Sequence, residues 1–393
     1  MTTICADTTR THGWAASVTM AATVFTVVTA EMLPVGLLTP MSDSLHVTEG
    51  AAGLALTATG VTSAVAAPVL PLLLGKVDRR AVLGGLMVLL AASAFAAAVT
   101  SAFAAAVTSA FVVLMVARVV MGVSIGGVWL FTVSLARRVV PEHAAGPATS
   151  LIFSGIGVAS VLGIPAGAYV GELAGWRWAF AGVGVLALIL AVALSIHLPS
   201  LPPERAVRLS DVREVIELRQ VRVGLVLVAL IVTGHFAAYT YVRPLLEAHV
   251  APALIGAFLL AYGVAGVLGN FLTGALRPRR ALIVIATGIA LTALAMPTIG
   301  SSAAGSLVLL VIWGLAYGGT TVSTQAWAHA AAPSAPESSS AVLVGVYNGS
   351  IALGAFTGGQ VADHFGTATV TWLPAVLATS ALVVLLANRR QRG

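Results

Sequence analysis

Long apolar stretches alternate with short polar breaks along the whole 393-residue chain. A helix that crosses a hydrocarbon core of about 30 Å needs about 20 mostly apolar residues. The stretches are much longer than the roughly 10-residue alternating segments of membrane β-barrels. Twelve of them reach the length of a spanning helix: 14–38, 51–74, 81–103, 109–136, 147–171, 179–198, 223–246, 252–276, 281–300, 305–331, 341–363 and 367–387. The pattern predicts an all-α membrane protein with twelve transmembrane helices.

The composition excludes several classes of function. Hydrophobic residues make up 59% of the chain and charged residues only 9%, whereas soluble domains carry about 25% charged residues. A soluble enzyme, a nucleic-acid-binding protein and a disordered chain are therefore excluded. The single cysteine, Cys5, leaves no intrachain disulfide and no cysteine-based metal site. The sequence also has no phosphate-binding glycine loop, no His, Asp or Glu cluster with metal-ligand spacing and no nucleophile elbow. We therefore expect that the protein is not an enzyme and uses no cofactor.

The charges are distributed unevenly between the polar breaks. Of the 20 basic residues, 17 fall in alternate segments: the N-terminus, 76–80, 137–138, 205–222, 277–280 and the C-terminal tail. Cytoplasmic loops of membrane proteins carry such an excess, which predicts cytoplasmic termini and a location in the inner (plasma) membrane. The exceptions are Arg118, inside an apolar stretch, and Arg177 and Arg243 in the opposite set of loops. The net charge of +6 is thus explained by the orientation of the chain in the membrane and by contact with anionic lipid.

The longest polar segment divides the chain near its midpoint. It predicts an N-terminal six-helix bundle over 1–198, a cytoplasmic linker over 199–222 and a C-terminal six-helix bundle over 223–393. The motif that begins at Gly75 has a counterpart that begins at Gly274, about half the chain further on. Two pseudo-symmetric six-helix halves around a midplane site are typical of secondary transporters.

A shorter repeat is local. The octad at 96–103 is followed at once by the same eight residues at 104–111. We interpret it as a tolerated duplication in an alanine-rich connection and assign it no function.

Several motifs resemble those of one transporter family. The loop Gly75–Arg80, the segment Arg118–Gly122 and the glycine-rich segment Gly155–Gly171 resemble motifs of the major facilitator superfamily. Finer matches, at Glu31–Leu38 and Gly234–Pro244, resemble the sugar efflux transporters of its twelve-span drug/proton antiporter branch. The chain departs from the family where the loop lacks its usual second glycine and where Arg243 replaces a residue that is often acidic.

The resemblance implies the major facilitator fold and a secondary active exporter of a small solute, working by proton antiport and alternating access. It favours a sugar or sugar-like substrate, with a multidrug or chloramphenicol-type drug as the alternative. The proton gradient would supply the energy without a cofactor. The expected partners are the solute, protons and membrane lipid, and the expected functional unit is a monomer. A non-transporting receptor or a channel is the alternative of a different class.

Glu31 and Arg118 are the candidates for proton coupling. Each lies about seven residues, or roughly 10 Å, from the predicted outer end of its span. A charge at such depth is costly and is by default a functional hypothesis. Burial disfavours the carboxylate and a nearby arginine favours it, so the pair would let Glu31 exchange a proton. The alternative is a static ion pair or a carboxyl bonded to the backbone.

Candidate substrate-binding residues carry polar groups without permanent charge. His235 and Tyr239 are four residues apart and share a helix face, and their side chains suit a polyhydroxylated ligand. The C-terminal half adds Trp313, Tyr317, Gln325 and Asn348. The alternative for these residues is helix packing.

Two further groups bear on the conformational change. Gly163, Gly167 and Gly171 form a small-residue stripe with Pro165 between them, which predicts close helix packing and a bend. The resemblance implies that this is the antiporter motif, with a role in antiport. It also implies that Asp78, Arg79 and Arg80 form a conformational latch, whereas the arginines alone are equally explained by topology.

Overall fold

The computed structural model describes residues 2–74, 77–100, 110–135, 138–141, 144–202 and 209–388. Within these ranges the chain forms helices and no β-strand. Twelve of the helical segments are long and apolar enough to cross a membrane. The predicted all-α membrane architecture with twelve spans is therefore confirmed. Most of the octad repeat, 101–109, lies outside the described residues.

The helices of the first half precede the polar linker. They are α1 (Thr2–Leu45), α2 (Glu49–Leu73), α3 (Arg79–Ala98), α5 (Ala110–Leu135), α6 (Ala145–Val158), the π-helical turn η2 (Ala159–Gly163), α7 (Ile164–Ala174) and α8 (Trp176–His197). Segments α6, η2 and α7 form one span. The π turn lies just before Pro165, which has no N–H to continue the regular ladder.

The second half begins with a short linker helix. Its elements are α9 (Leu209–Glu217), α10 (Arg219–Tyr239), α11 (Val242–Glu247), α12 (Pro252–Gly274), α13 (Pro278–Ile299), α14 (Ala303–Tyr317), α15 (Thr320–Ala331), α16 (Pro336–Phe365), the 3-10 turn η3 (Thr367–Thr371) and α17 (Trp372–Ala387).

Two spans differ in detail from the hydropathy pattern. The stretch predicted over 223–246 starts earlier, at Arg219, and is split by a turn into α10 and α11. The stretch predicted over 305–331 is interrupted at Gly318 and Gly319. A Cβ at Gly318 would overlap the backbone of Gly266 in α12, so the glycine allows this break to lie directly against the neighbouring helix.

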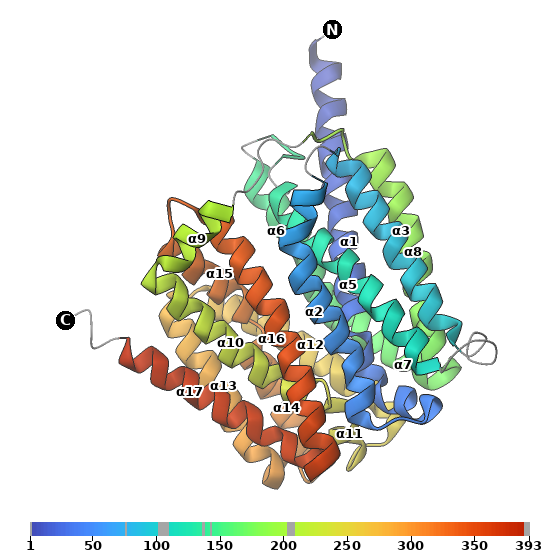
Figure 1. The fold of residues 1–393 in the computed structure, drawn as a ribbon, viewed down its shortest axis with the longest axis vertical. Coiled ribbons are helices and arrows are strands. Elements are labelled where there is room, and N and C mark those ends of the chain that lie inside the picture. The colour runs from blue at the N-terminus through green and yellow to red at the C-terminus, as the bar shows by residue number, and fades with distance from the viewer. Residues whose placement is uncertain are drawn as a thin grey trace.

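The two halves meet along two seams. Figure 1 shows α1–α8 on one side and α10–α17 on the other, with α2 and α16 side by side between them. The first seam, between α2 and α16, is closely packed because Gly60 lies against the backbone of Asn348 and the Cβ of Ala352. In the second seam α12 packs on η2 and α7. There a Cβ at Gly263 would overlap the backbone of Ser160.

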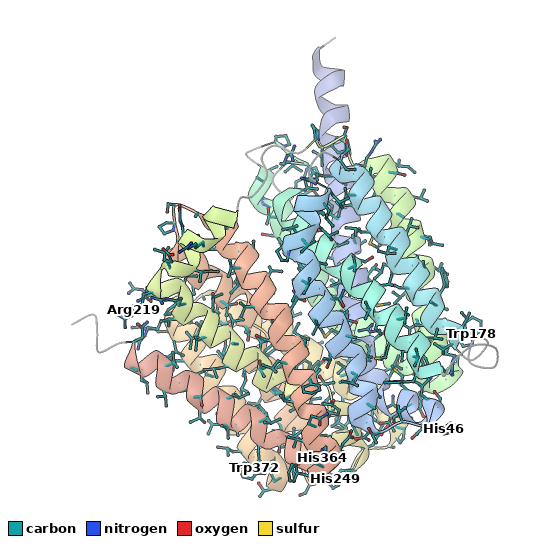
Figure 2. The ribbon with its side chains drawn as sticks, in the orientation of Figure 1. His46, Trp178, Arg219, His249, His364 and Trp372 are labelled. Carbon is teal, nitrogen blue, oxygen red and sulfur yellow. The ribbon has the colours of Figure 1, made fainter. Side chains whose placement is uncertain are left out.

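Labelled side chains locate the two ends of the spans. Arg219 lies near α9, whereas His46, His249 and His364 lie at the other end of the molecule (Figure 2). We call the end with the three histidines the outer end, because the charge pattern predicts that it faces away from the cytoplasm.

Candidate functional site

Glu31 lies on α1 where the two halves face each other. Its side chain is buried, and among the acidic residues of the described ranges only Glu31 is less than a tenth exposed. The Trp129 indole of α5 lies within hydrogen-bonding reach of the carboxylate. Its Oε1 atom is buried without a partner. On the opposite half, Tyr347 of α16 is close enough for the Glu31 charge to act on its phenol.

Arg118 of α5 is fully buried, and backbone carbonyls satisfy its guanidinium. Its Nη1 donates to the Ala30 carbonyl at 2.8 Å, Nη2 to the Glu31 carbonyl at 3.0 Å and Nε to the Ala55 carbonyl at 2.9 Å. A guanidinium presents several N–H groups in a fixed fork, so one side chain joins α1, α2 and α5. Arg118 thus lies beside Glu31, but its bonds reach the Glu31 backbone and not the carboxylate.

A stack of aromatic rings fills the C-terminal half near this position. We call it the ring column and define it as Tyr317, His235, Tyr239 and Tyr262. The ring centroids of His235 and Tyr317 are 3.4 Å apart at an interplanar angle of 5°, and those of His235 and Tyr239 are 4.8 Å apart at 23°. Tyr262 lies 4.7 Å from Tyr239 and 6.4 Å from His235, so it packs beside these rings and does not extend the stack in line. The structure thus brings the predicted residues His235, Tyr239 and Tyr317 together.

Hydroxyl contacts connect the ring column to Tyr347, the residue whose phenol lies within reach of the Glu31 charge. The hydroxyls of Tyr317 and Tyr347 are 2.7 Å apart, and Thr321 Oγ1 is 3.3 Å from the Tyr347 hydroxyl. Tyr317 and Tyr347 are half-buried, whereas His235, Tyr239 and Tyr262 are buried. A carboxylate and two phenols therefore lie in one region between the halves, and such groups can bind an uncharged polar ligand.

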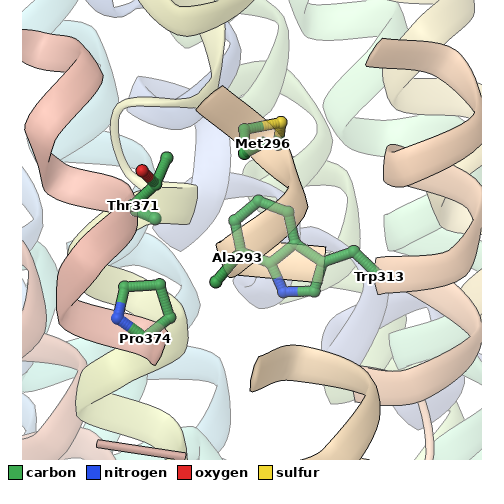
Figure 3. A pocket seen from close by; sticks show the side chains of 6 residues that line it. Ala293, Met296, Trp313, Thr371 and Pro374 are labelled. Atoms are coloured by element: carbon green, nitrogen blue, oxygen red, sulfur yellow. The ribbon is translucent and has the colours of Figure 1, made fainter. Parts of the chain in front are cut away.

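Trp313 lies at the side of the ring column. Its indole contacts His235 edge-on at a centroid distance of 5.3 Å. Its other neighbours line a small apolar pocket of about 10 Å³, far smaller than the roughly 300 Å³ of the smallest ligand sites. Figure 3 shows the ring among Ala293, Met296, Thr371 and Pro374.

Gln325 and Asn348 lie apart from the ring column. Gln325 Nε2 bonds to Ser340 Oγ and lies 3.1 Å from His329 Nε2, so it belongs to a polar group between α15 and α16. Asn348 is buried in the α2–α16 seam and donates to the Val344 carbonyl of its own helix at 3.0 Å.

Sequence reasoning missed two residues of this region. Tyr262 completes the ring column from α12, and Trp129 approaches Glu31 from α5. Both are large amphipathic side chains inside predicted spans, which was the available signal. Helical spacing could not relate them to Glu31 or His235, because they lie on different helices.

The predicted glycine stripe packs against α1 in register. A Cβ at Gly163 would overlap the Thr29 side chain, one at Gly167 would lie 3.1 Å from Leu33, and one at Gly171 would overlap Leu37. Each partner on α1 is four residues from the next, as in the stripe itself. The α1 segment that carries Glu31 is therefore held closely by α7 and η2.

The predicted latch residues bond to the N-terminal half and to the start of the linker. Asp78 caps α3 by accepting from the Arg80 N–H at 2.8 Å, and it also accepts from the Ser200 hydroxyl and the Leu201 N–H. The Ser200 hydroxyl and these backbone N–H groups hold the pKa of the Asp78 carboxyl below its usual range. Arg79 lies over the Phe131 ring at 4.8 Å, and Arg80 donates to the Leu198 carbonyl. Their latch role stays a prediction.

At the outer end, Arg243 connects the two halves. Its Nη1 donates to the Gly36 carbonyl of α1 at 2.8 Å and its Nη2 to Glu172 of α7 at 3.0 Å, while Nε bonds to Glu247 of its own helix at 2.8 Å. The Arg243 side chain is 3% exposed. A buried guanidinium with two carboxylates and a carbonyl is well satisfied, so the contact ties α11 to both α1 and α7.

A second outer contact lies beside the α2–α16 seam. Asp363 of α16 accepts from the Thr48 hydroxyl at 2.7 Å and from the Gly50 N–H at 3.0 Å. The Thr367 hydroxyl donates to Glu49 at 2.8 Å. Together with Arg243, these bonds hold the halves together at the outer end.

Comparisons with known proteins identify the family to which this architecture belongs. The sequence profile of the Major Facilitator Superfamily matches residues 19–359. The purine ribonucleoside efflux pump NepI of Salmonella enteritidis PT4 (strain P125109) is 28% identical over 390 residues, which cover 98% of this chain and 96% of the pump.

Two solved structures share the fold. The xylose transporter XylE from E. coli, in a partially occluded inward-open conformation, superposes with a TM-score of 0.75 at 12% identity, covering 96% of this chain and 98% of XylE. A D-xylose-proton symporter gives a TM-score of 0.71 at 15% identity, covering 95% and 96% of the two chains.

Proposed function

This chain belongs to the major facilitator superfamily, and from that premise we propose that it exports a small, uncharged, sugar-bearing solute in exchange for protons. Membership makes it an integral membrane transporter and not an enzyme. The proposal adds the direction of transport, the proton coupling and the class of solute.

The observation that carries the proposal is the position of Glu31. Its buried carboxylate has one oxygen without a partner and lies between the halves, opposite the Tyr317–Tyr347 hydroxyl pair. Burial favours the neutral acid, and exposure to water on one side favours the charged form. The carboxylate would accept hydrogen bonds from solute hydroxyls. Protonation would remove that charge and release the solute, so that proton and solute occupy the site in turn.

The direction and the solute class are supported by a relative. NepI is a purine ribonucleoside efflux pump, and the similarity extends over nearly the full length of both chains. A purine ribonucleoside carries a sugar, which agrees with the sugar-like class implied by the motifs. The bundle 1–198 would rock against 223–393 about the two seams, with cytoplasmic termini, the proton gradient as the energy source and a monomer as the working unit.

An amphiphilic drug is the second candidate solute. The rings near Glu31 favour it, because apolar, aromatic sites bind such molecules. The two candidates differ in one respect: a sugar-bearing solute needs the hydroxyl and carboxylate groups, whereas an apolar drug needs only the rings.

Solute uptake into everted membrane vesicles tests the proposal. Vesicles with the protein should accumulate radiolabelled ribosides when a proton gradient is imposed, and an uncoupler should abolish this accumulation. Vesicles without the protein are the control. Accumulation that persists after uncoupling would contradict proton antiport. Accumulation of drugs without any sugar-bearing solute would favour the second candidate.

A further inference from the structure

The end of α16 bonds to the start of α2 at the outer end. The carboxylate of Asp363 accepts from the Gly50 N–H at 3.0 Å and from the Thr48 hydroxyl at 2.7 Å. Thr48 is the N-cap residue of α2, and its hydroxyl accepts in turn from the Ala51 N–H at 3.1 Å. Two N–H groups that the first turn of a helix leaves unpaired are thus satisfied, one by Thr48 and one by Asp363.

Gly50 allows the carboxylate from the other half to come this close. A Cβ at position 50 would overlap the Asp363 carboxylate and the Gly359 carbonyl. A carboxylate next to the positive N-terminal end of a helix is stabilising. Asp363 therefore completes the cap of α2 from the opposite half, and we call its bonds to Gly50 and Thr48 the inter-half cap.

The first half carries an acid at the corresponding place. Glu172 lies three residues before Gly175, which ends α7 with a φ of 93°. Asp363 lies three residues before Gly366, which ends α16 with a φ of 87°. Each acid bonds to the opposite half, since Glu172 accepts from Arg243 and Asp363 from the start of α2. The two spans therefore end alike, and both ends bear a contact between the halves.

The inter-half cap depends on the relative position of the two halves. Asp363 belongs to the second half and α2 to the first, so under alternating access their bonds would break when the outer side opens. The Gly50 N–H then loses its acceptor, and a helix without its cap frays at the first turn. In the second turn of α2 the Ala55 carbonyl accepts from Arg118, which also bonds to the backbone of Glu31. The first two turns of α2 therefore contact both the outer end and the region of Glu31.

We propose that Asp363 caps α2 across the two halves, so that the first turn of α2 is fully helical while the outer side is closed and frays when it opens. The proposal rests on the alternating access of the proposed function and deepens it. Asp363 is a positioning residue of the transport cycle, because it acts through the start of α2.

Hydrogen–deuterium exchange of the full-length protein in lipid nanodiscs tests the inter-half cap. The readout is the exchange rate of the backbone amides at 49–52. Asp363→Ala should speed this amide exchange about threefold or more, the order expected when a helix loses a capping group. The control is Asp43→Asn, which removes a neighbouring exposed acid whose charge also acts on Glu49. Unchanged amide exchange in Asp363→Ala, or equal acceleration in both variants, would overturn the cap.

Arg243→Gln distinguishes a cap that depends on closure from a static one. Arg243 bonds to α1, α7 and its own helix α11, so the variant weakens the outer contacts while Asp363 and Gly50 stay unchanged. A cap that depends on closure predicts faster amide exchange at 49–52 in this variant too, and the natural rate in Arg177→Gln. The natural rate in Arg243→Gln would overturn the dependence on closure. This comparison remains decisive if Asp363→Ala fails to fold.

Solute uptake into everted vesicles, measured beside amide exchange, separates this inference from the proposed function. Proton-driven uptake by the natural protein, together with the natural amide exchange rate in Arg243→Gln, would leave the exporter intact and overturn the conditional cap. Faster amide exchange in Arg243→Gln and Asp363→Ala without any proton-driven uptake would support the cap and contradict the exporter. Natural amide exchange in both variants and no uptake would count against both.

Discussion

Two buried charges at similar depth are accommodated in different ways. Arg118 has its N–H groups bonded to three backbone carbonyls, whereas Glu31 keeps a buried oxygen without a partner. A cation whose N–H groups are bonded to backbone carbonyls is a structural element. A carboxyl oxygen without a partner can exchange a proton or accept a hydrogen bond from a ligand. The first therefore fits a positioning role and the second fits the site of chemistry.

Replacing Glu31 with glutamine should separate proton coupling from solute movement. The amide keeps the shape but cannot release a proton, so proton-driven uptake into everted vesicles should fall to background. Exchange of labelled for unlabelled solute without a gradient should persist. Proton-driven uptake at the natural rate would contradict the role of Glu31.

Asp78 provides a prediction for pH. Its pKa is lowered in the folded protein by the Ser200 hydroxyl and by backbone N–H groups, so the charged form stabilises the fold above the unfolded-state pKa. That contribution is lost as the pH falls through the lowered folded-state pKa. Asp78→Asn should therefore reduce the unfolding temperature at pH 7, and its difference from the natural protein should shrink below about pH 4.

A matched acid checks this pH dependence. Glu214 is exposed on α9, and Glu214→Gln should change the unfolding temperature little across the same range. Thermal unfolding in detergent at several pH values provides the measurement. A constant difference between Asp78→Asn and the natural protein from pH 7 to pH 3 would contradict the assignment.

At the scale of elements, α1 is packed against the fifth span along most of its membrane length. The stripe of Gly163, Gly167 and Gly171 faces Thr29, Leu33 and Leu37, and Gly155 continues the contact nearer the other end. The π turn before Pro165 lies within this interface. Small residues allow backbones to approach closely where lipid supplies no hydrophobic driving force.

Gly155→Ala should destabilise the protein. A Cβ at this position would overlap the Ala21 carbonyl and lie 3.0 Å from the Phe25 N atom, so the helices must separate. Overpacking of this kind costs about 1–3 kcal/mol. The control is Gly182→Ala on α8, where a Cβ meets nothing within 4 Å. Thermal unfolding should show a loss for the first variant and no loss for the second, and equal values would contradict the packing argument.

For the whole molecule, side-chain bonds at the end we call outer connect the two halves. Arg243 connects α11 with α1 and α7, and Asp363 connects α16 with the start of α2. Under the proposed alternating access, these contacts would break when the outer side opens. The basic residue that departs from the family pattern is thus part of the outer closure.

Arg243→Gln should favour opening at the outer end. The variant leaves the partly exposed Glu172 and Glu247 without their cation and weakens the bonds from Arg243 to α1 and α7. A reporter cysteine, Thr57→Cys in a Cys5→Ser background, should react several-fold faster with an impermeant maleimide added from outside. Arg177→Gln is the control, because Arg177 bonds to Thr100 and lies over Trp176 within its own half. Equal rates in the two variants would contradict the closure role.

The sequence by itself determined the number and type of the spans and the family. Hydropathy is a local property, because each stretch of about 20 apolar residues must form a helix in lipid whatever surrounds it. The motifs are local too, so the resemblance identified the superfamily. Spacing within one helix also predicted the glycine stripe and the pairing of His235 with Tyr239.

The tertiary structure alone decided which helices supply the rest of the site. Tyr262 and Trp129 join it from separate spans, Trp313 turns toward a side pocket, and Arg118 bonds to carbonyls and not to a carboxylate. The Gly36 carbonyl and its partner Arg243 are 207 positions apart in the chain. Periodicity relates residues one or two turns apart, whereas contacts across halves depend on how whole helices pack, and that packing is set by the fold.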